Sequence, residues 1–494
     1  MTRRIATVLA GAIAFFVFAT LNSGGYRYGA SDQSFYIPAI LLELEPGLFP
    51  RDSALLQPQA RYFMVDEILA TLMRQIGGSI EQWFLAGYVL SLLILYGALL
   101  SLGLKVFRSP LAVAALIAAA TLRHRIAKTG VNTLEGYFHP RVLVFAIGVT
   151  AIALYLRGRP WGALILVACG AAVHPSTAAF FLLLLGVATW WTDPRARPLL
   201  AACATVVGLL ATWMLFAGPW RGALAPMDAE WRTLLSTKDY LFPLDDWGIG
   251  VWAINLGTAI LACAGLHARL RAGDANARER GLLAGALFLL AAFLVTTPLV
   301  AMGSALLVQL QISRVFWVLE LLALLAVIWW FVDRPAARPD GRWMAAAVVG
   351  VLVVGSFARG VWVGGVERER NVFQPTLPAT EWTAVLRWLA AHTPQNANIL
   401  ANPGHAWRYG VPVRLTGRDV YLEDVKDTAM ALYSRDVAQR VIRRTRDLGD
   451  FDALTADRAR DLATQYDLNY LISTAKLDLT LLASQGRFHI YRLR

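Results

Sequence analysis

The sequence is poor in charged residues and in cysteine for its length. Of its 494 residues only 16% are charged, whereas 57% are hydrophobic and the mean hydropathy is +0.50. A soluble protein of this size could not bury so much apolar surface, so the composition predicts a polytopic membrane protein. The three cysteines, Cys169, Cys203 and Cys263, lie in apolar segments. This placement excludes a disulfide framework or a cysteine-based metal cluster and predicts small core residues.

Motifs of soluble catalysis are also missing. The sequence has no GxxxxGK[ST], no GxGxxG after a strand, no HExxH and no CxxC. Without a nucleotide-binding loop, an ATP-driven pump is excluded from the function classes considered. The net charge of +12 is spread over short loops between apolar runs. That pattern is typical of membrane orientation and contact with membrane lipids, so we expect no nucleic-acid partner.

Long apolar runs with short polar breaks make up most of the first 360 residues. A helix needs about 20 apolar residues to cross a bilayer, and by this measure we count about eleven predicted spans. The first is long for the apolar part of a signal peptide, so we expect an uncleaved first helix. The runs are 5–21, 84–104, 109–122, 141–156, 161–173, 175–191, 198–217, 249–267, 281–298, 314–332 and 343–358.

The distribution of lysine and arginine predicts the orientation of these spans. Cytoplasmic loops carry an excess of both residues. With the N-terminus in the cytoplasm, every cytoplasmic loop is basic, and an odd number of spans sends the C-terminus outside. We therefore expect a multi-pass protein of the bacterial inner membrane, with a first external loop at 22–83. The cytoplasmic basic residues are Arg3, Arg4, Lys105, Arg108, Arg157, Arg159, Arg195, Arg197, Arg269, Arg271, Arg278, Arg280, Arg334, Arg338 and Arg342.

The composition changes after residue 360, where the spanning runs end. Residues 382–392 have the pattern of an amphipathic helix, and polar-faced helices are expected at 436–446 and 456–466. Strands are expected at 397–401, 420–422, 468–473 and 488–493. The fold class is therefore mainly α. It combines a transmembrane helical bundle over 1–359 with a small extracytoplasmic α/β domain, in the periplasm, over 360–494.

Ionisable residues gather at the predicted external ends of the spans. Asp32 and Asp52 follow the first span, and the external loop at 122–141 is basic against the orientation rule. Placing a charged group at membrane depth costs free energy, so these are candidate functional residues. A carboxylate can deprotonate a hydroxyl or hold a divalent cation, and cations can bind a phosphate. The candidate phosphate-binding residues are Arg123, His124, Arg125, Lys128, His139, Arg141, His174 and Arg314.

Each of these residues also has a purely structural interpretation. Asp32 and Asp52 stand where helix N-caps are expected. His139 and His174 each precede a proline, as at the start of a helix. The basic residues of 123–141 could bind lipid headgroups, and Arg314 could extend its charge to the interface. We interpret Arg418 and Lys426, in the C-terminal domain, as surface residues.

The layout resembles the GT-C superfamily, membrane glycosyltransferases that use polyprenyl-phosphate sugars. The shared features are an early Asp in the first external loop, a Pro- and aromatic-rich stretch after it, many spans and an extracytoplasmic C-terminal domain. The segment "LRWLAAHTPQNANILANP" is similar to the start of that domain in bacterial GT-C-like proteins of unassigned function. The resemblance implies that Asp32 is catalytic or binds a metal. Gln33 and Ser34 stand in place of the family's Asp-x-Asp or Asp-Glu pair.

Our leading hypothesis is therefore an enzyme that transfers a sugar from a polyprenyl-phosphate donor to an extracytoplasmic lipid, glycan or protein. Asp32 and Asp52 are its candidate catalytic residues. Mg or Mn is the candidate cofactor, with Asp32 as the candidate ligand. Two alternatives stay open: a transporter or flippase of an amphiphilic solute, and a non-catalytic GT-C-like assembly partner.

Overall fold

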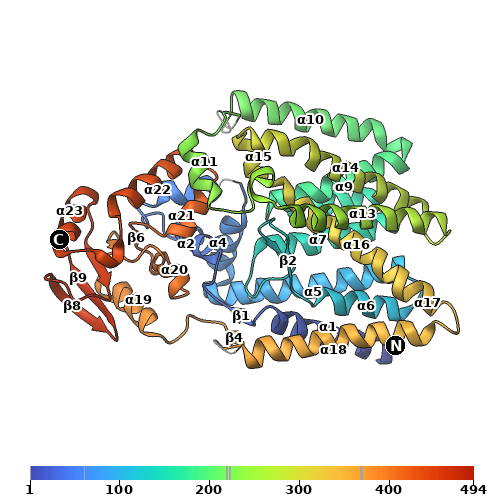
Figure 1. Ribbon diagram of the computed structural model, residues 1–494, viewed down its shortest axis with the longest axis horizontal. Helices are drawn as coiled ribbons and strands as arrows, with labels where there is room; N and C mark the ends of the chain where they lie inside the picture. The colour runs from blue at the N-terminus through green and yellow to red at the C-terminus, as the bar shows by residue number, and fades with distance from the viewer. Residues whose placement is uncertain (1, 61, 219–220, 222–223, 368–370) are drawn as a thin grey trace. The chain divides into compact units, whose positions relative to one another are not determined.

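The computed structural model describes the chain except residues 1, 61, 219–220, 222–223 and 368–370 (Figure 1). It divides into two compact units, and the chain passes between them several times. The helical unit comprises Met1–Tyr26, Ala86–Asp228 and Lys238–Val372. The sheet unit comprises Arg27–Leu85, Ala229–Thr237 and Phe373–Arg494. The predicted boundary at 359/360 lies near the observed one at 372/373. The predicted first external loop, at 22–83, however, belongs largely with the C-terminal residues rather than with the predicted spans.

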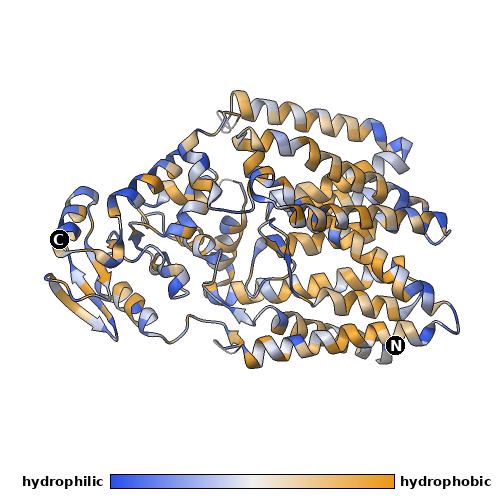
Figure 2. Cartoon of the chain, in the orientation of Figure 1, coloured by the Kyte–Doolittle hydropathy of each residue, from blue (hydrophilic) through white to orange (hydrophobic). Residues whose placement is uncertain are grey.

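Each of the eleven predicted apolar runs overlaps a helix, and eight helical segments in the described part are long and apolar enough to cross a membrane. Figure 2 shows the hydrophobic residues concentrated along these helices. The eight segments are α1 (Thr2–Asn22), α5 (Ile80–Val106), α9 (Pro175–Thr192), α10 (Arg197–Phe216), α13 (Ile249–Arg271), α14 (Ala277–Ala301) and the runs Ala305–Ala336 and Arg342–Val366. Three apolar helices are shorter: α6 (Pro110–Ala120), α7 (Pro140–Leu156) and α8 (Pro160–Gly170).

The last two of the eight segments are built from several elements each. The first run joins α15 (Ala305–Leu310), η2 (Ile312–Arg314), α16 (Val315–Ile328), the π-helical η3 (Trp329–Asp333) and α17 (Arg334–Ala336). The second joins α18 (Arg342–Val361) and the π-helical η4 (Trp362–Val366). The connections of the helical unit hold β2 (Arg125–Ile126), β3 (Val131–Asn132), η1 (Pro194–Ala196) and α12 (Pro243–Asp246).

Close packing of α9 against α14 and of α13 against α16 forms much of the core of the helical unit. A Cβ atom at Gly285 would lie 2.4 Å from the carbonyl oxygen of Leu184, so only glycine allows these two backbones to approach so closely. The rings of Phe145 and Trp317 stack with centroids 4.0 Å apart. Membrane helices associate through such close packing, because lipid offers no hydrophobic driving force between them.

The sheet unit contains a five-stranded mixed sheet in the order β6-β5-β7-β9-β8. Strand β5 (Asn398–Leu400) runs parallel to β6 (Asp419–Val420) and β7 (Tyr470–Ser473), while β9 (Phe488–Arg492) pairs antiparallel with β7 and β8 (Thr480–Gln485). Helix α19 (Glu381–His392) buries Trp382, Val385, Leu386 and Leu389 in a core that includes Ile399, Ile472 and Ile490. The small C-terminal α/β domain is thus confirmed; β8 was not predicted.

Helices from distant parts of the chain complete the sheet unit. The segment after the first apolar helix contributes α2 (Gln33–Leu44), α3 (Ser53–Ala60) and α4 (Val65–Ile76), and the segment at 229–237 contributes α11 (Ala229–Ser236). Trp231 of α11 donates a hydrogen bond to the carbonyl oxygen of Ala431 at 2.8 Å. The remaining elements are β1 (Tyr26–Arg27) at the boundary, β4 (Phe373–Gln374), α20 (His405–Arg408), η5 (Val413–Thr416), α21 (Asp424–Met430), α22 (Arg435–Leu448), η6 (Phe451–Ala453) and α23 (Ala456–Tyr466).

Candidate functional site

Asp32 stands at the start of α2, as predicted, but its carboxylate is not used to cap the helix. The residue occupies the N-cap position, yet its side chain makes no capping hydrogen bond. Its Oδ1 instead accepts a hydrogen bond at 2.8 Å from Nζ of Lys426, on α21. The Asp32 side chain is 27% exposed and that of Lys426 is 10% exposed. The carboxylate is therefore reachable from solvent, while its cationic partner is largely enclosed.

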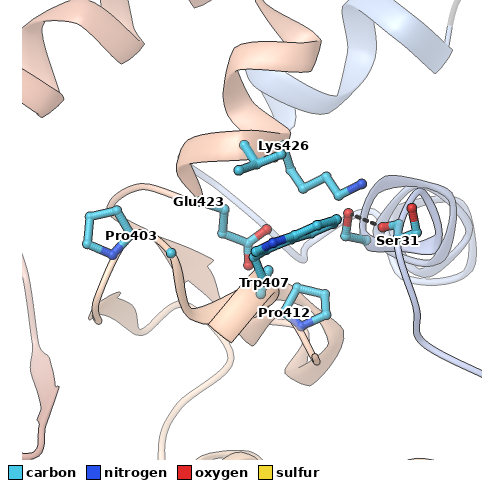
Figure 3. A pocket seen from close by; sticks show the side chains of 10 residues that line it. Ser31, Pro403, Trp407, Pro412, Glu423 and Lys426 are labelled. Atoms are coloured by element: carbon cyan, nitrogen blue, oxygen red, sulfur yellow. Dashed lines mark hydrogen bonds between the residues drawn. The ribbon is translucent and has the colours of Figure 1, made fainter. Parts of the chain in front are cut away.

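Lys426 also lines a hollow in the sheet unit. Figure 3 shows its side chain extending above the ring of Trp407 towards Ser31. The Trp407 residue is 71% exposed, so this aromatic surface is open to a ligand. Ser34 Oγ donates to the carbonyl oxygen of Ser31 at 2.8 Å (Figure 3). The hollow is lined by Ser31, Ser34, Pro403, Gly404, Ala406, Trp407, Pro412, Glu423, Val425 and Lys426.

Glu423 closes one side of the hollow and is held ionised. Its Oε2 accepts from Nη1 of Arg414 at 2.9 Å, and its Oε1 lies 3.1 Å from Nε2 of the buried His405. Burial alone would raise the pKa of Glu423, but the charge of Arg414 and the contact with His405 lower it below its ordinary value. This carboxylate is thus engaged in a fixed ion pair, which makes it a poor proton acceptor for a ligand.

Asp52 belongs to the same buried network and has no exposed surface. Its Oδ2 accepts from Nε of Arg414 at 2.7 Å and from the backbone N–H of Val420 at 2.9 Å, and Arg440 donates to its Oδ1. Burial raises the pKa of Asp52, but the charges of Arg414 and Arg440 outweigh this and lower it. Because both carboxylate oxygens accept hydrogen bonds from protein donors, the geometry suits a structural role that fastens the first loop to the C-terminal residues.

The segment between α6 and α7 forms a second group of charges, in the helical unit. Arg141 donates to Glu135 and, at 3.1 Å, to the carbonyl oxygen of Gly130. Arg123 donates through Nε to the carbonyl oxygen of Leu134 at 3.0 Å, and its Nη2 lies 4.0 Å from the same Glu135 carboxylate. Glu135 therefore links two of the predicted phosphate-binding arginines and keeps both in place.

His139 and His174 adjoin this group and begin helices, as their structural interpretation predicted. The His139 ring accepts from the backbone N–H of Arg141 at the start of α7, and the His174 ring accepts from Thr177 N at the start of α9. The two rings lie 6.1 Å apart. Removal from water and the nearby charges of His139, Arg314 and Arg141 lower the pKa of His174 well below its ordinary value. We call Arg123, Arg141 and Arg314, together with the neighbouring rings of His139 and His174, the cationic cluster.

The other three predicted phosphate-binding residues point elsewhere. His124 Nε2 contacts Glu320 Oε1 at 2.5 Å. Arg125 is exposed on β2. Lys128 donates to the carbonyl oxygen of Asp246 at 2.9 Å and lies 3.5 Å from Asp239. The basic residues of the loop at 122–141 thus contact several different partners and do not form one continuous anion site.

Two residues interpreted as surface positions are in fact buried, and that interpretation was wrong. Arg418 is 7% exposed and donates to the carbonyl oxygens of Thr416 and Thr393 at 2.6 and 2.7 Å. Lys426 is 8% exposed and pairs with Asp32. Charge alone suggested exposure, because the partner of Lys426 lies 394 residues away and the partners of Arg418 are mainly backbone carbonyls, which leave no mark in the sequence. A weak signal was available in the alternation of charged and apolar residues along 413–427.

The residues around Asp32 do not fit a divalent cation. Its carboxylate is paired with an ammonium group, and in the described part of the chain no three His, Cys, Asp or Glu side chains are grouped so that they could hold a metal ion. The reaction proposed below therefore involves neither Mg nor Mn. Comparison with protein-family models and with curated proteins found no match.

Proposed function

We propose that the chain is a membrane-embedded glycosyltransferase of GT-C-like architecture, which transfers a sugar from a polyprenyl phosphate to an extracytoplasmic acceptor. The eight apolar helical segments support a polytopic membrane protein. The proposal further assigns eleven spans, a cytoplasmic N-terminus and a periplasmic sheet unit in the bacterial inner membrane, on the strength of the lysine and arginine distribution.

The observation that carries the proposal is the Asp32–Lys426 pair beside the Trp407 hollow. A carboxylate at the start of a helix ordinarily caps it, and this one does not. Its ammonium partner is largely enclosed, while the aromatic surface next to it is open. A sugar can lay its apolar C–H face on the tryptophan ring, which leaves its hydroxyl groups and its phosphate for the charged pair. The hollow therefore offers a surface for the sugar and a cation, and the base lies beside it, paired with that cation.

In the proposed reaction, Asp32 acts as general base and Lys426 as the cation for the leaving phosphate. The acceptor oxygen bonds to the anomeric carbon of the sugar as the bond from that carbon to the phosphate oxygen breaks. The acceptor proton passes to the Asp32 carboxylate, and the electron pair stays on the polyprenyl phosphate. Binding of the phosphate by Lys426 releases Asp32 from its ion pair, so the base becomes free only when a donor is bound. The cationic cluster is a further candidate for phosphate contact.

The decisive experiment replaces Asp32 with asparagine and follows transfer of labelled sugar from its polyprenyl carrier. Loss of a general base lowers the rate by a factor of about 10²–10⁴. Stability should change little, because no capping bond is lost and the amide oxygen of asparagine can still accept the hydrogen bond from Lys426. The matched control is Asp424→Asn, which removes an exposed carboxylate from the same α21 that carries Lys426. If D32N and D424N transfer sugar equally well, Asp32 is not the base.

The second candidate is a protein that binds the donor without catalysing transfer. Two observations favour it: Lys426 neutralises the charge of Asp32, and Gln33 and Ser34 stand where the family has its second acidic residue. A transporter or a non-catalytic assembly partner of this kind would bind the polyprenyl phosphate without transfer. The two candidates separate on the wild-type chain, which binds the donor in both cases but forms labelled product only if it is an enzyme. In the enzyme, Lys426→Gln should lower both donor binding and turnover.

A further inference from the structure

A second hollow lies where the last two apolar segments meet, in the helical unit. It is lined by Trp330, Arg334, Pro335, Arg338, Asp340, Gly341, Trp343 and Met344. The two segments, Ala305–Ala336 and Arg342–Val366, follow each other directly. If both cross the bilayer, the turn between them lies at one membrane surface. The continuous helical part of the first segment, Val315–Ala336, has 22 residues, about 33 Å at 1.5 Å per residue, which exceeds the roughly 30 Å hydrocarbon core, so its end reaches the headgroup region.

Two tryptophans flank this hollow with their side chains outward. Trp330 is 51% exposed and Trp343 is 73% exposed, whereas Trp329, one position earlier, is 1% exposed. Residues Trp329–Asp333 form a π-helical turn, a feature frequent at functional sites. Exposed tryptophans at the ends of spans are typical of the membrane–water interface. They indicate that the opening of the hollow faces lipid rather than bulk water.

The charges in the hollow favour an anion. Arg334 is fixed by stacking, because its guanidinium carbon lies 4.8 Å from the centroid of Trp330 and 5.2 Å from that of Trp329. Arg338 lines the same hollow, and Asp340 is the acidic residue among the lining side chains. Two guanidinium groups against one carboxylate leave a net positive charge. Guanidinium groups are well suited to phosphate, which they bind through two parallel hydrogen bonds.

The turn that carries these residues is preformed. Arg338 N donates to the carbonyl oxygen of Pro335 at 3.0 Å, and Gly341 N donates to that of Arg338 at 3.2 Å. A Cβ atom at Gly341 would lie 2.4 Å from the carbonyl oxygen of Pro335, so the turn closes this tightly only with glycine. A ligand would therefore meet a set of charges whose backbone is already ordered, which lowers the entropy that binding must overcome.

We propose that this hollow binds the phosphate group of an anionic phospholipid, with Arg334 and Arg338 on the phosphate and the two exposed tryptophans against the upper acyl chains. This site is distinct from the Trp407 hollow, and the proposal does not depend on the transferase proposal. A free phosphate would share the contacts with arginine but would gain nothing from the tryptophans. The bilayer lipid is therefore the favoured source of the phosphate.

Native mass spectrometry of the full chain, released from phosphatidylcholine nanodiscs that also hold phosphatidylglycerol, tests this proposal. We expect retained phosphatidylglycerol in the wild type and about a fivefold weakening for each of Arg334→Gln and Arg338→Gln. The matched control is Arg195→Gln, an exposed arginine in another turn between apolar helices. Arg334→Lys keeps the charge and should fall between the wild type and Arg334→Gln.

Several results would overturn the proposal. Equal retention of phosphatidylglycerol in R334Q, R338Q and R195Q would show that this turn has no specific lipid-binding site. Equal retention of phosphatidylcholine or phosphatidylethanolamine would remove the preference for an anionic headgroup. Displacement of the lipid by inorganic phosphate or by soluble glycerophosphate would identify a free-anion site instead. Because Arg338 lies exposed on the surface, its variant should fold normally and keeps the test valid if Arg334→Gln fails to accumulate.

Discussion

Arg414 shows how much of the sheet unit depends on one buried cation. It pairs with Asp52 at 2.7 Å, with Glu423 at 2.9 Å and with Asp427, and all of these side chains are at most 2% exposed. Removal of the guanidinium would leave three carboxylates buried with too few counter-charges. Loss of one partner from a buried ion pair typically costs about 3–5 kcal/mol. We therefore expect Arg414→Met to lower the stability of the full chain by at least this much, measured by thermal unfolding in detergent.

A surface arginine provides the control for this measurement. Arg408 pairs with Asp452 at 3.4 Å, and their side chains are 53% and 62% exposed. Exposed pairs contribute only about 0–1 kcal/mol, because water solvates both partners once they separate. Arg408→Met should therefore unfold close to the wild type. If the two variants unfold at the same temperature, the buried network does not fasten the sheet unit.

At the residue scale, the sequence predicted positions better than partners. The helix starts at Gln33, Pro140 and Pro175 are local features, and the residues before them signalled each start correctly. The partner of Asp32 lies 394 residues further along the chain, and that of Asp52 lies 362 residues further. A single sequence contains no local signal for such distant pairs. This is why Lys426 was read as a surface residue and Arg414 was not identified.

At the scale of elements, α9 and α10 look alike in sequence but differ in environment. Both are apolar enough to span a membrane. Leu184 of α9 has no exposed surface, whereas α10 has no buried residue and its Leu209 is 66% exposed. Apolarity alone identified both helices as spans, but it could not tell which of them packs against protein. In a membrane chain both protein and lipid surround a helix with apolar atoms, so the sequence pattern is the same.

This difference leads to a prediction about leucine-to-alanine changes. Leu184→Ala should destabilise the chain by about 2–5 kcal/mol, because it opens a cavity in packed protein. Leu209→Ala should stay within about 0.5 kcal/mol of the wild type, because surrounding lipid or detergent fills the vacated space. Thermal unfolding followed by tryptophan fluorescence compares the two. An equally damaging Leu209→Ala would show that α10 packs against protein, such as a second copy of the chain.

At the scale of the whole molecule, the number of spans decides on which side of the membrane the C-terminus lies. The helices α6 and α8 have 11 residues each, about 16 Å at 1.5 Å per residue, and α7 has 17 residues. Each is shorter than a hydrocarbon core of roughly 30 Å. If these three also cross a locally thinned bilayer, there are eleven spans and the termini face opposite sides. With the eight longer segments alone, the termini face the same side.

We expect the odd number, because it leaves every cytoplasmic loop basic. A C-terminal alkaline phosphatase fusion should then be active, and a C-terminal fluorescent protein that matures only in the cytoplasm should be dark. A fusion made after Asp274, in the turn between α13 and α14, is the matched control and should give the reverse pattern, since Arg269, Arg271, Arg278 and Arg280 surround it. If instead the C-terminal fusion fluoresces and the Asp274 fusion does not, the C-terminal part of the chain has the reverse of the predicted orientation. The sheet unit with its Trp407 hollow would then face the cytoplasm, where the proposed extracytoplasmic transfer cannot take place.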